Sequence, residues 1–200
     1  MSINPDLSAE EIDQPVSYTD VVRDRLLVVE GDFDFGFFRE LLDRNGRRKV
    51  QILTVDGREK ISSRTQVRVL ADDKDQLRWI GVARDADADA SAALRSLQGT
   101  LCELQKIRGW IPIPDEAWRR TDNDSGRSVT LFVFPEGEAS GDIERWIWSA
   151  LKDDTIASCV DRYVSCLSDA EVELPREWKT RVYAYLSALA RPEMPLRAAA

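Results

Sequence analysis

Acidic residues stand at the ends of three of the strands that the sequence predicts. Glu30 ends the first strand, Asp85 and Asp87 follow the third, and Glu136 and Glu138 follow the fourth. Carboxylate oxygens are the ligands that hard cations such as Mg²⁺ and Mn²⁺ prefer. In a parallel sheet the carboxyl ends of the strands share one edge, and ligands bind there. The pattern therefore favours a divalent-cation site among these carboxylates.

Helix capping is the simpler explanation for each acidic cluster taken alone. Acidic residues at a helix N-terminus stabilise the helix by about 0.3–1 kcal/mol, and this suffices for Asp32, Asp89 and Asp142. It does not suffice for Glu30, which extends a buried apolar strand, where an unpaired carboxylate would be costly. Gly31 follows directly and leaves room for a ligand to approach the backbone. The three clusters together favour a metal site over capping.

The chain has no histidine, so it contains neither a Ser-His-Asp triad nor a His-ligated zinc site. Catalysis must then use carboxylates, lysine, tyrosine or metal-bound water. The Asp-x-Asp-x-Asp spacing from Asp85 begins like an EF-hand loop, but Ala90 and Ser96 stand where that loop needs glycine and glutamate. A GxGxxG motif and a P-loop are both absent. A glycosyltransferase-type Asp-x-Asp site remains an alternative, although it leaves Glu30 unexplained.

Strands and helices alternate along the chain and must position these acids. Apolar runs predict four strands, over residues 25–30, 50–55, 79–84 and 129–134. Helical spacing predicts helices between and after them, over residues 33–44, 61–70, 90–107, 143–151, 156–167 and 178–189. The alternation predicts an α/β fold with a mainly parallel four-stranded sheet flanked by helices. We expect a loose arm over residues 1–22, an α/β domain over 23–152 and a helical segment packed on it over 153–200.

Composition limits the partners that the chain can take. The net charge of −8 and pI near 4.8 argue against a broad basic surface for nucleic acid. They do not argue against local contact with phosphate through a bound cation. No apolar run approaches the roughly 18 residues of a membrane span, and the acidic N-terminus is not a secretory signal. We therefore expect no membrane association and a cytoplasmic location.

Cys102, Cys159 and Cys166 lack CxxC spacing, and we expect them to be buried.

Four stretches carry a resemblance to a known family: LLVVEGDFDFGFF, VDGREKI, WIGVARDADAD and FPEGEASGDIERW. They resemble the DUF3226 family of small Toprim-like proteins over residues 24–190, and are more distantly similar to the Toprim domain of OLD-family nucleases. The resemblance implies a Toprim-like fold in which Glu30 is the Toprim glutamate and Asp85 and Asp87 are the Asp-x-Asp pair. It further implies that Asp34 and Glu144 are additional metal ligands. It also implies that similar chains continue beyond Ala200.

The resemblance implies an Mg²⁺- or Mn²⁺-dependent nuclease, or a nuclease subunit, that cleaves phosphodiester bonds in nucleic acid, with DNA as the expected substrate. Lys60, in a Gly-x-x-Lys stretch, would stabilise charge on the phosphate, although a solvated loop lysine is an equal alternative. The chain lacks the fused ATPase of OLD nucleases. The alternative function is therefore a non-catalytic metal-binding module that acts with a partner, such as an ATPase or a second copy.

Trp146 and Trp148 cannot share one helix face, so we expect one to be exposed.

Overall fold

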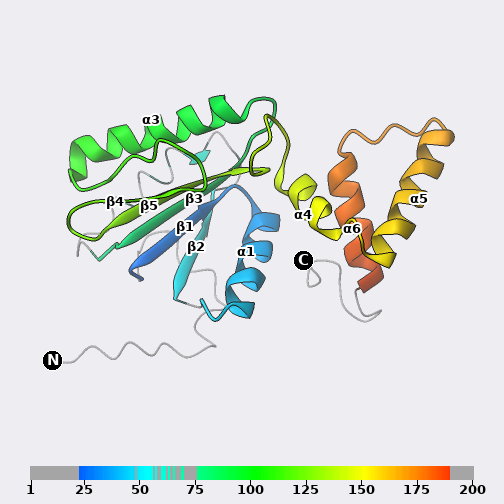
Figure 1. Cartoon of the computed structure of the whole chain (residues 1–200), viewed down its shortest axis with the longest axis horizontal. Helices are drawn as coiled ribbons and strands as arrows, with labels where there is room; N and C mark the ends of the chain where they lie inside the picture. The colour runs from blue at the N-terminus through cyan, green and yellow to red at the C-terminus, as the bar shows by residue number, and fades with distance from the viewer. Residues whose placement is uncertain are drawn as a thin grey trace.

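The computed structural model of the chain contains one five-stranded sheet (Figure 1). It describes residues 23–189 except 48, 56, 58, 59, 62, 64, 66–68 and 70–75, so the predicted arm over residues 1–22 lies outside the described residues. The strands are β1 (Arg25–Val29), β2 (Val50–Thr54), β3 (Trp79–Asp85), β4 (Arg120–Asp122) and β5 (Ser128–Phe134). They lie in the order β2-β1-β3-β5-β4.

The predicted parallel sheet is confirmed, with one strand more than expected. β1 pairs in parallel with β2 and β3, and β3 pairs in parallel with β5. β4 is the additional strand and pairs with β5 in the antiparallel sense. It has only three residues, Arg-Thr-Asp, and none of them is buried. Such a short polar segment carries no apolar pattern, which is why the sequence did not predict it.

The helices cover both faces of the sheet and then extend beyond it. Their bounds are α1 (Asp32–Arg44), α3 (Ala90–Arg108), α4 (Ile143–Leu151), α5 (Thr155–Asp169) and α6 (Glu177–Leu189). Residues 60, 61, 63, 65 and 69 are also helical, within or next to the predicted helix over 61–70. α3 lies along one face of the sheet and α1 against the other (Figure 1). α4, α5 and α6 form a helical C-terminal part on the side where β1 and β5 end.

α4 joins the sheet to this helical part because both of its faces are covered. Trp146 packs on Phe134 of β5, with ring centroids 5.3 Å apart. Trp148 is 7% exposed and packs on Tyr185 of α6, with centroids 6.3 Å apart. The two tryptophans do face different sides, but the expectation that one is exposed is wrong. α6 and α5 cover the side of the helix that the sheet leaves open.

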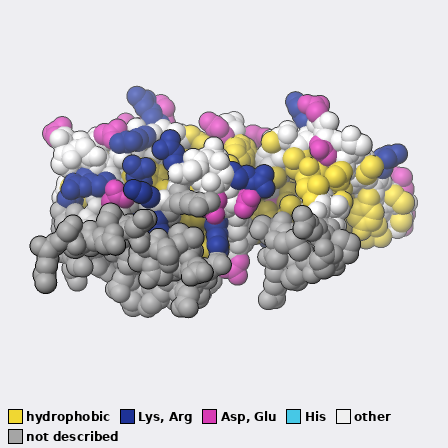
Figure 2. Space-filling model, turned by 90° about the horizontal axis from the view of Figure 1, so that it is seen from below, with side chains coloured by type: hydrophobic (Ala, Val, Ile, Leu, Met, Phe, Trp, Pro, Cys, Tyr) yellow, Lys and Arg dark blue, Asp and Glu magenta, His cyan; other side chains and the backbone are white. Residues whose placement is uncertain are grey.

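The surface differs between the two parts of the molecule. Seen from below, apolar side chains gather over the helical part, while several Lys and Arg side chains lie over the part that contains the sheet (Figure 2).

The expectation of buried cysteines is also wrong, since Cys102, Cys159 and Cys166 are all exposed. The inward positions of α5 are taken instead by Ala157, Val160 and Val164. None of the described helices is long and apolar enough to span a bilayer.

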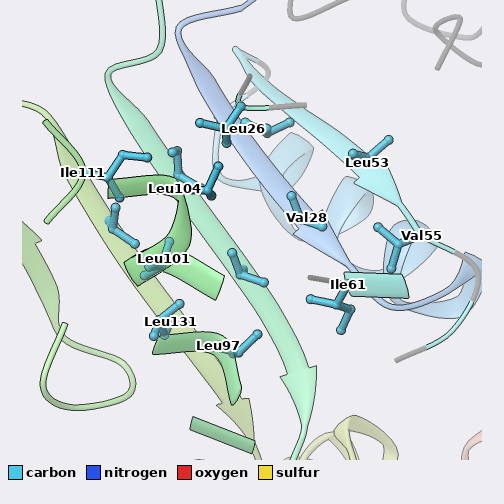
Figure 3. Packing of buried hydrophobic residues seen from close by; sticks show 14 of the residues in the cluster. Leu26, Val28, Leu53, Val55, Ile61, Leu97, Leu101, Leu104, Ile111 and Leu131 are labelled. Carbon is cyan, nitrogen blue, oxygen red and sulfur yellow. The ribbon is translucent and has the colours of Figure 1, made fainter. Parts of the chain in front are cut away.

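Alternating side chains of the central strands form two cores, one on each face of the sheet. Leu26 and Val28 of β1 face the α3 side, where they meet a row of α3 leucines, Leu97, Leu101 and Leu104 (Figure 3). Leu27 and Val29 face the opposite side and pack with Phe38 of α1. Strands buried on both faces read as continuous apolar runs, which explains why β1, β3 and β5 were predicted correctly.

Candidate metal site

The turn from β1 into α1 supplies two of the predicted carboxylates. Glu30 follows the last residue of β1, and its Oε2 atom is buried. Gly31 caps α1 and donates its backbone N–H to Oδ2 of Asp34, at 2.9 Å. A Cβ built on Gly31 would meet nothing within 4 Å, so the backbone beside Glu30 is open to a ligand. The turn therefore holds both acids at the carboxyl end of β1.

The end of β3 is tied to the start of α4. Oδ1 of Asp85 accepts a hydrogen bond of 2.9 Å from the backbone N–H of Ile143, the first residue of α4. Two residues later, Asp87 and Gly141 exchange backbone hydrogen bonds of 2.8 Å in both directions. Gly141 has a φ of 131°, and a Cβ there would lie 2.9 Å from Pro135 Cδ, so this position requires glycine.

Glu144 enters the cluster from α4 and is almost completely buried. It is the second residue of the helix, and 6% of the residue is exposed. Its Oε1 atom lies 3.4 Å from Nζ of Lys179, on α6. Glu144 therefore faces α6, whose Lys179 balances its charge, while it stays close enough to Asp85 to affect the pKa of that residue.

Asp85 is the electrostatic centre of this cluster. Burial is the main reason that its pKa is raised from 3.8 to about 8, and the charges of Asp34, Glu144 and Glu30 raise it further. The Ile143 N–H acts in the opposite direction because it stabilises the ionised form. Three carboxyl groups, from the residue after β1, from α1 and from α4, thus lie within electrostatic reach of Asp85 at the end of β3.

Asp34 shows the same effect to a smaller degree. Burial raises its pKa from 3.8 to about 6, the Gly31 N–H lowers it, Glu144 raises it and Lys179 lowers it. Asp34 and Asp85 also line one small pocket, whose apolar wall includes Phe38, Phe134 and Ile143. That wall limits hydration of the two carboxyl groups, which is the physical cause of both shifts.

The remaining predicted residues lie at the edge of the cluster or outside it. Asp87 is exposed and has a φ of 52°, a left-handed conformation that is uncommon for aspartate. Asp89 caps α3 by accepting a 3.0 Å hydrogen bond from Ala92 N–H, as predicted.

Lys60 is exposed. Its backbone N–H donates to the Gly57 carbonyl, and the Gly57 N–H donates to the Glu30 carbonyl. Lys60 thus lies at the same edge of the sheet, but it forms no ion pair with the described carboxylates.

The carboxylates share a neighbourhood but do not converge on one point. Within the described ranges, no three Asp, Glu or Cys side chains are grouped closely enough to hold a metal ion. The hydrogen bonds explain this separation, because Asp34 bonds to Gly31 N–H, Asp85 to Ile143 N–H and Glu144 pairs with Lys179.

Lys179 is the residue of this site that sequence reasoning missed. It lies 35 positions after Glu144, within an amphipathic helix whose pattern predicts packing and carries no sign of a site. Only the packing of α6 on α4 brings the two residues together.

Comparison with known proteins identifies one matching family and no individual relative. A family model described as "Protein of unknown function (DUF3226)" matches residues 24–200, which include every residue of the site. Neither the curated proteins nor the solved structures contain a match to the chain.

Proposed function

Because the chain belongs to the DUF3226 family, a family without an assigned activity, we propose its function from the site itself. We infer that the chain is an Mg²⁺- or Mn²⁺-dependent hydrolase with a Toprim-like site, cleaving phosphodiester bonds in nucleic acid. The observation that carries the proposal is that Asp34 and Asp85 line one pocket at the carboxyl ends of β1 and β3, with Glu30 and Glu144 close enough to raise the pKa of Asp85. Two of these acids, Asp34 and Asp85, line one partly apolar pocket, where their ionised forms are unfavourable unless a cation is bound nearby.

The chemistry of the donor set fits a hard cation. All four groups offer oxygen, the chain has no histidine, and its cysteines are exposed elsewhere. Oxygen-only sites suit Mg²⁺ and Mn²⁺ and do not suit softer metals. Glu30 and Asp85 would hold the ion, with Asp87 beside them and with Asp34 and Glu144 as further ligands. When bound, such an ion activates water and neutralises charge on a phosphate.

The protein's own groups orient the ligands and exclude solvent. The Ile143 N–H holds Asp85 in place through Oδ1, and the Gly31 N–H does the same for Asp34. Phe38 and Phe134 keep the inner side of the pocket apolar, which strengthens electrostatic interactions within it. The exposed Lys60 lies at the outer edge, where its positive charge would attract a phosphodiester. With a net charge of −8, the chain alone should bind DNA weakly and in a salt-sensitive way.

Asp85→Asn is the sharpest test, because asparagine keeps the size of the side chain and can still accept the Ile143 N–H. We expect wild type to nick or degrade DNA at low salt with Mn²⁺ or Mg²⁺ and not with EDTA. We expect Asp85→Asn and Glu30→Gln to lose at least about 100-fold in rate while they remain folded, since a metal ligand is lost.

Asp89→Asn is the matched control, because Asp89 belongs to the same acidic stretch but caps α3, and asparagine caps equally well. Its activity should equal that of wild type. Equal cleavage by all four proteins would indicate a contaminating nuclease and would contradict the proposal.

The surface of the helical part favours a second candidate, a metal-binding module that acts with a partner protein. Among the described residues of this part, large apolar side chains are exposed at Tyr163, Val172, Tyr183 and Leu189. Exposed apolar side chains of this size occur at protein interfaces. Folded protein that binds Mn²⁺ but cleaves no DNA under any of these conditions would favour this function over hydrolysis.

A further inference from the structure

Arg84 lies directly before Asp85 at the carboxyl end of β3, and its side chain faces the other side of the sheet. It is opposite Val133 of β5, which belongs to the core on the α3 side, whereas Asp85 is opposite Phe134, in the core on the α1 side. Paired strand residues point to the same face, and successive residues point to opposite faces. The edge of the sheet therefore carries a carboxyl group on the α1 side and a guanidinium on the α3 side.

This guanidinium has a buried donor that the chain does not satisfy. The Nε atom of Arg84 is buried and has no hydrogen-bond partner. Within the part of the chain that the structure describes, no carboxylate forms an ion pair with Arg84 either. A buried donor on a charged group is costly when no acceptor is bound to it. Arg84 therefore calls for an oxygen acceptor from outside the protein.

Glu30 is the carboxylate that the register of the sheet brings to Arg84. β1 and β3 pair in parallel, with Val28 opposite Val82. Two residues further along each strand, the same register places Glu30 beside Arg84 and on the same face. The two side chains nevertheless form no ion pair with each other. The guanidinium is thus available to an anion other than Glu30.

The approach to this part of the edge is open and carries a second cation. A Cβ built on Gly31 would meet nothing within 4 Å. Lys60 is exposed, and its backbone is linked to the Glu30 carbonyl through Gly57. A guanidinium presents its N–H groups as a planar fork that matches the oxygens of a phosphate, and a lysine adds a point charge. Two cations at one open edge favour a phosphate group as the ligand.

We propose that Arg84 binds a phosphate group of a nucleic acid through its guanidinium, on the α3 side of the sheet edge. This inference rests on the proposed function for the class of substrate, and it adds the residue that holds the phosphate. The ligand would lie beside Asp85, across the edge from the pocket of Asp34 and Asp85. Binding of this kind needs neither a metal ion nor cleavage, so both can be left out of its test.

Fluorescence anisotropy of a labelled single-stranded DNA oligonucleotide, with the full chain in EDTA at low salt, measures this binding. We expect Arg84→Met to raise the Kd at least about 10-fold, because a charge-assisted contact is lost. Arg84→Lys should give an intermediate Kd, since it keeps the charge and loses the fork. Inorganic phosphate should compete with the oligonucleotide for wild type and much less for Arg84→Met.

The urea midpoint of Arg84→Met separates a ligand-binding role from a structural one. The variant removes a buried donor that has no acceptor, so its midpoint should not be lower than that of wild type. If Arg84 instead held Glu30 in place, the midpoint would fall, because a buried carboxylate would lose its partner.

Arg95→Met is the matched control, because it removes the same charge from an exposed arginine of α3, whose only contact with Asp89 is 3.9 Å long among the described ion pairs. Its Kd should stay within about twofold of wild type. An unchanged Kd or a lowered midpoint for Arg84→Met, or no binding by wild type, would overturn this inference. Wild type that binds the oligonucleotide but cleaves no DNA with Mn²⁺ would contradict the proposed hydrolase and leave this inference intact.

Discussion

Two aspartates give this histidine-free chain groups that titrate near neutral pH. The pKa of Asp85 is raised to about 8 and that of Asp34 to about 6, in both cases mainly by burial. Both side chains are half-buried against Phe38 and Phe134. The unfolded chain would ionise the same groups near pH 4. The native, metal-free protein therefore binds protons that the unfolded chain releases, and its stability must depend on pH.

The free energy of unfolding of the metal-free protein should fall as pH rises from about 4 to about 8. Between these values native Asp85 keeps a proton that the unfolded chain has lost. Each pH unit therefore lowers the free energy of unfolding by at most about 1.4 kcal/mol through this group. Asp34 adds a similar fall between about pH 4 and 6. Asp85→Asn should remove most of the fall between pH 6 and 8. Denaturant unfolding in EDTA at pH 6, 7 and 8 measures the difference.

Asp89→Asn is again the control, since Asp89 is exposed and its variant should keep the slope of wild type. A slope for Asp85→Asn that matches wild type would show that Asp85 ionises normally in the folded chain. Adding Mn²⁺ should stabilise wild type more at pH 8 than at pH 6, because the ligands must lose their protons to bind it.

At the scale of elements, β3 is the strand on which the site depends. It lies between β1 and β5, and its last residue is Asp85. Its glycine, Gly81, allows close packing, because a Cβ there would lie 2.3 Å from Trp79 Cη2 and 2.9 Å from Leu27 Cδ1. Trp79 in turn donates its Nε1–H to Thr130 Oγ1 of β5 at 3.1 Å. Moving the indole would break this hydrogen bond between strands.

Gly81→Ala should lower the free energy of unfolding by about 1–3 kcal/mol, the usual cost of overpacking a core. Gly99→Ala is the matched control. Gly99 is exposed within α3 and its added Cβ would meet nothing within 4 Å, so the change should stabilise by about 0.5–1 kcal/mol. Urea unfolding of both variants measures the contrast. A loss below 0.5 kcal/mol for Gly81→Ala would show that Trp79 can shift freely.

The same elements show what could be predicted from the sequence. β1, β3 and β5 were predicted because strands buried on both faces are apolar throughout, and the acids at their ends were found because carboxylates rarely follow such runs. β4 has no such pattern. Lys179 could not be predicted either, because its role depends on how α6 packs against α4, and side-chain periodicity does not specify the packing partner. The cysteines were misjudged since small residues fit either face of a helix.

At the scale of the whole molecule, α4 connects the sheet to the helical C-terminal part. Phe33 and Ile147 pack against both the core beside α1 and the core of α5 and α6, so the two cores are continuous. Trp148 lies at the centre of the second core, with Tyr185 and the cation of Arg181 against it. This continuity predicts that the described part of the chain unfolds as one unit.

Trp148→Ala should lower the free energy of unfolding by about 3–5 kcal/mol, because it leaves a large cavity in the second core. In wild type, circular dichroism and tryptophan fluorescence should report one coincident transition. Tyr163→Ala is the control, since Tyr163 is 51% exposed and its loss should cost less than about 0.5 kcal/mol. Separate transitions in wild type would show that the helical part folds independently of the sheet.

Glu144 and Trp148 lie one turn apart on α4, about 6 Å along the helix axis. Trp148 anchors α4 to α6, and Lys179 of α6 pairs with Glu144. A protein that binds the exposed apolar residues of α5 and α6 would therefore act on the acidic cluster through the position of α6. A tilt of α6 would move the Lys179 ammonium away from Glu144 and would also shift Glu144 through Trp148. Binding at α5 and α6 would then change the charge balance at the edge of the sheet.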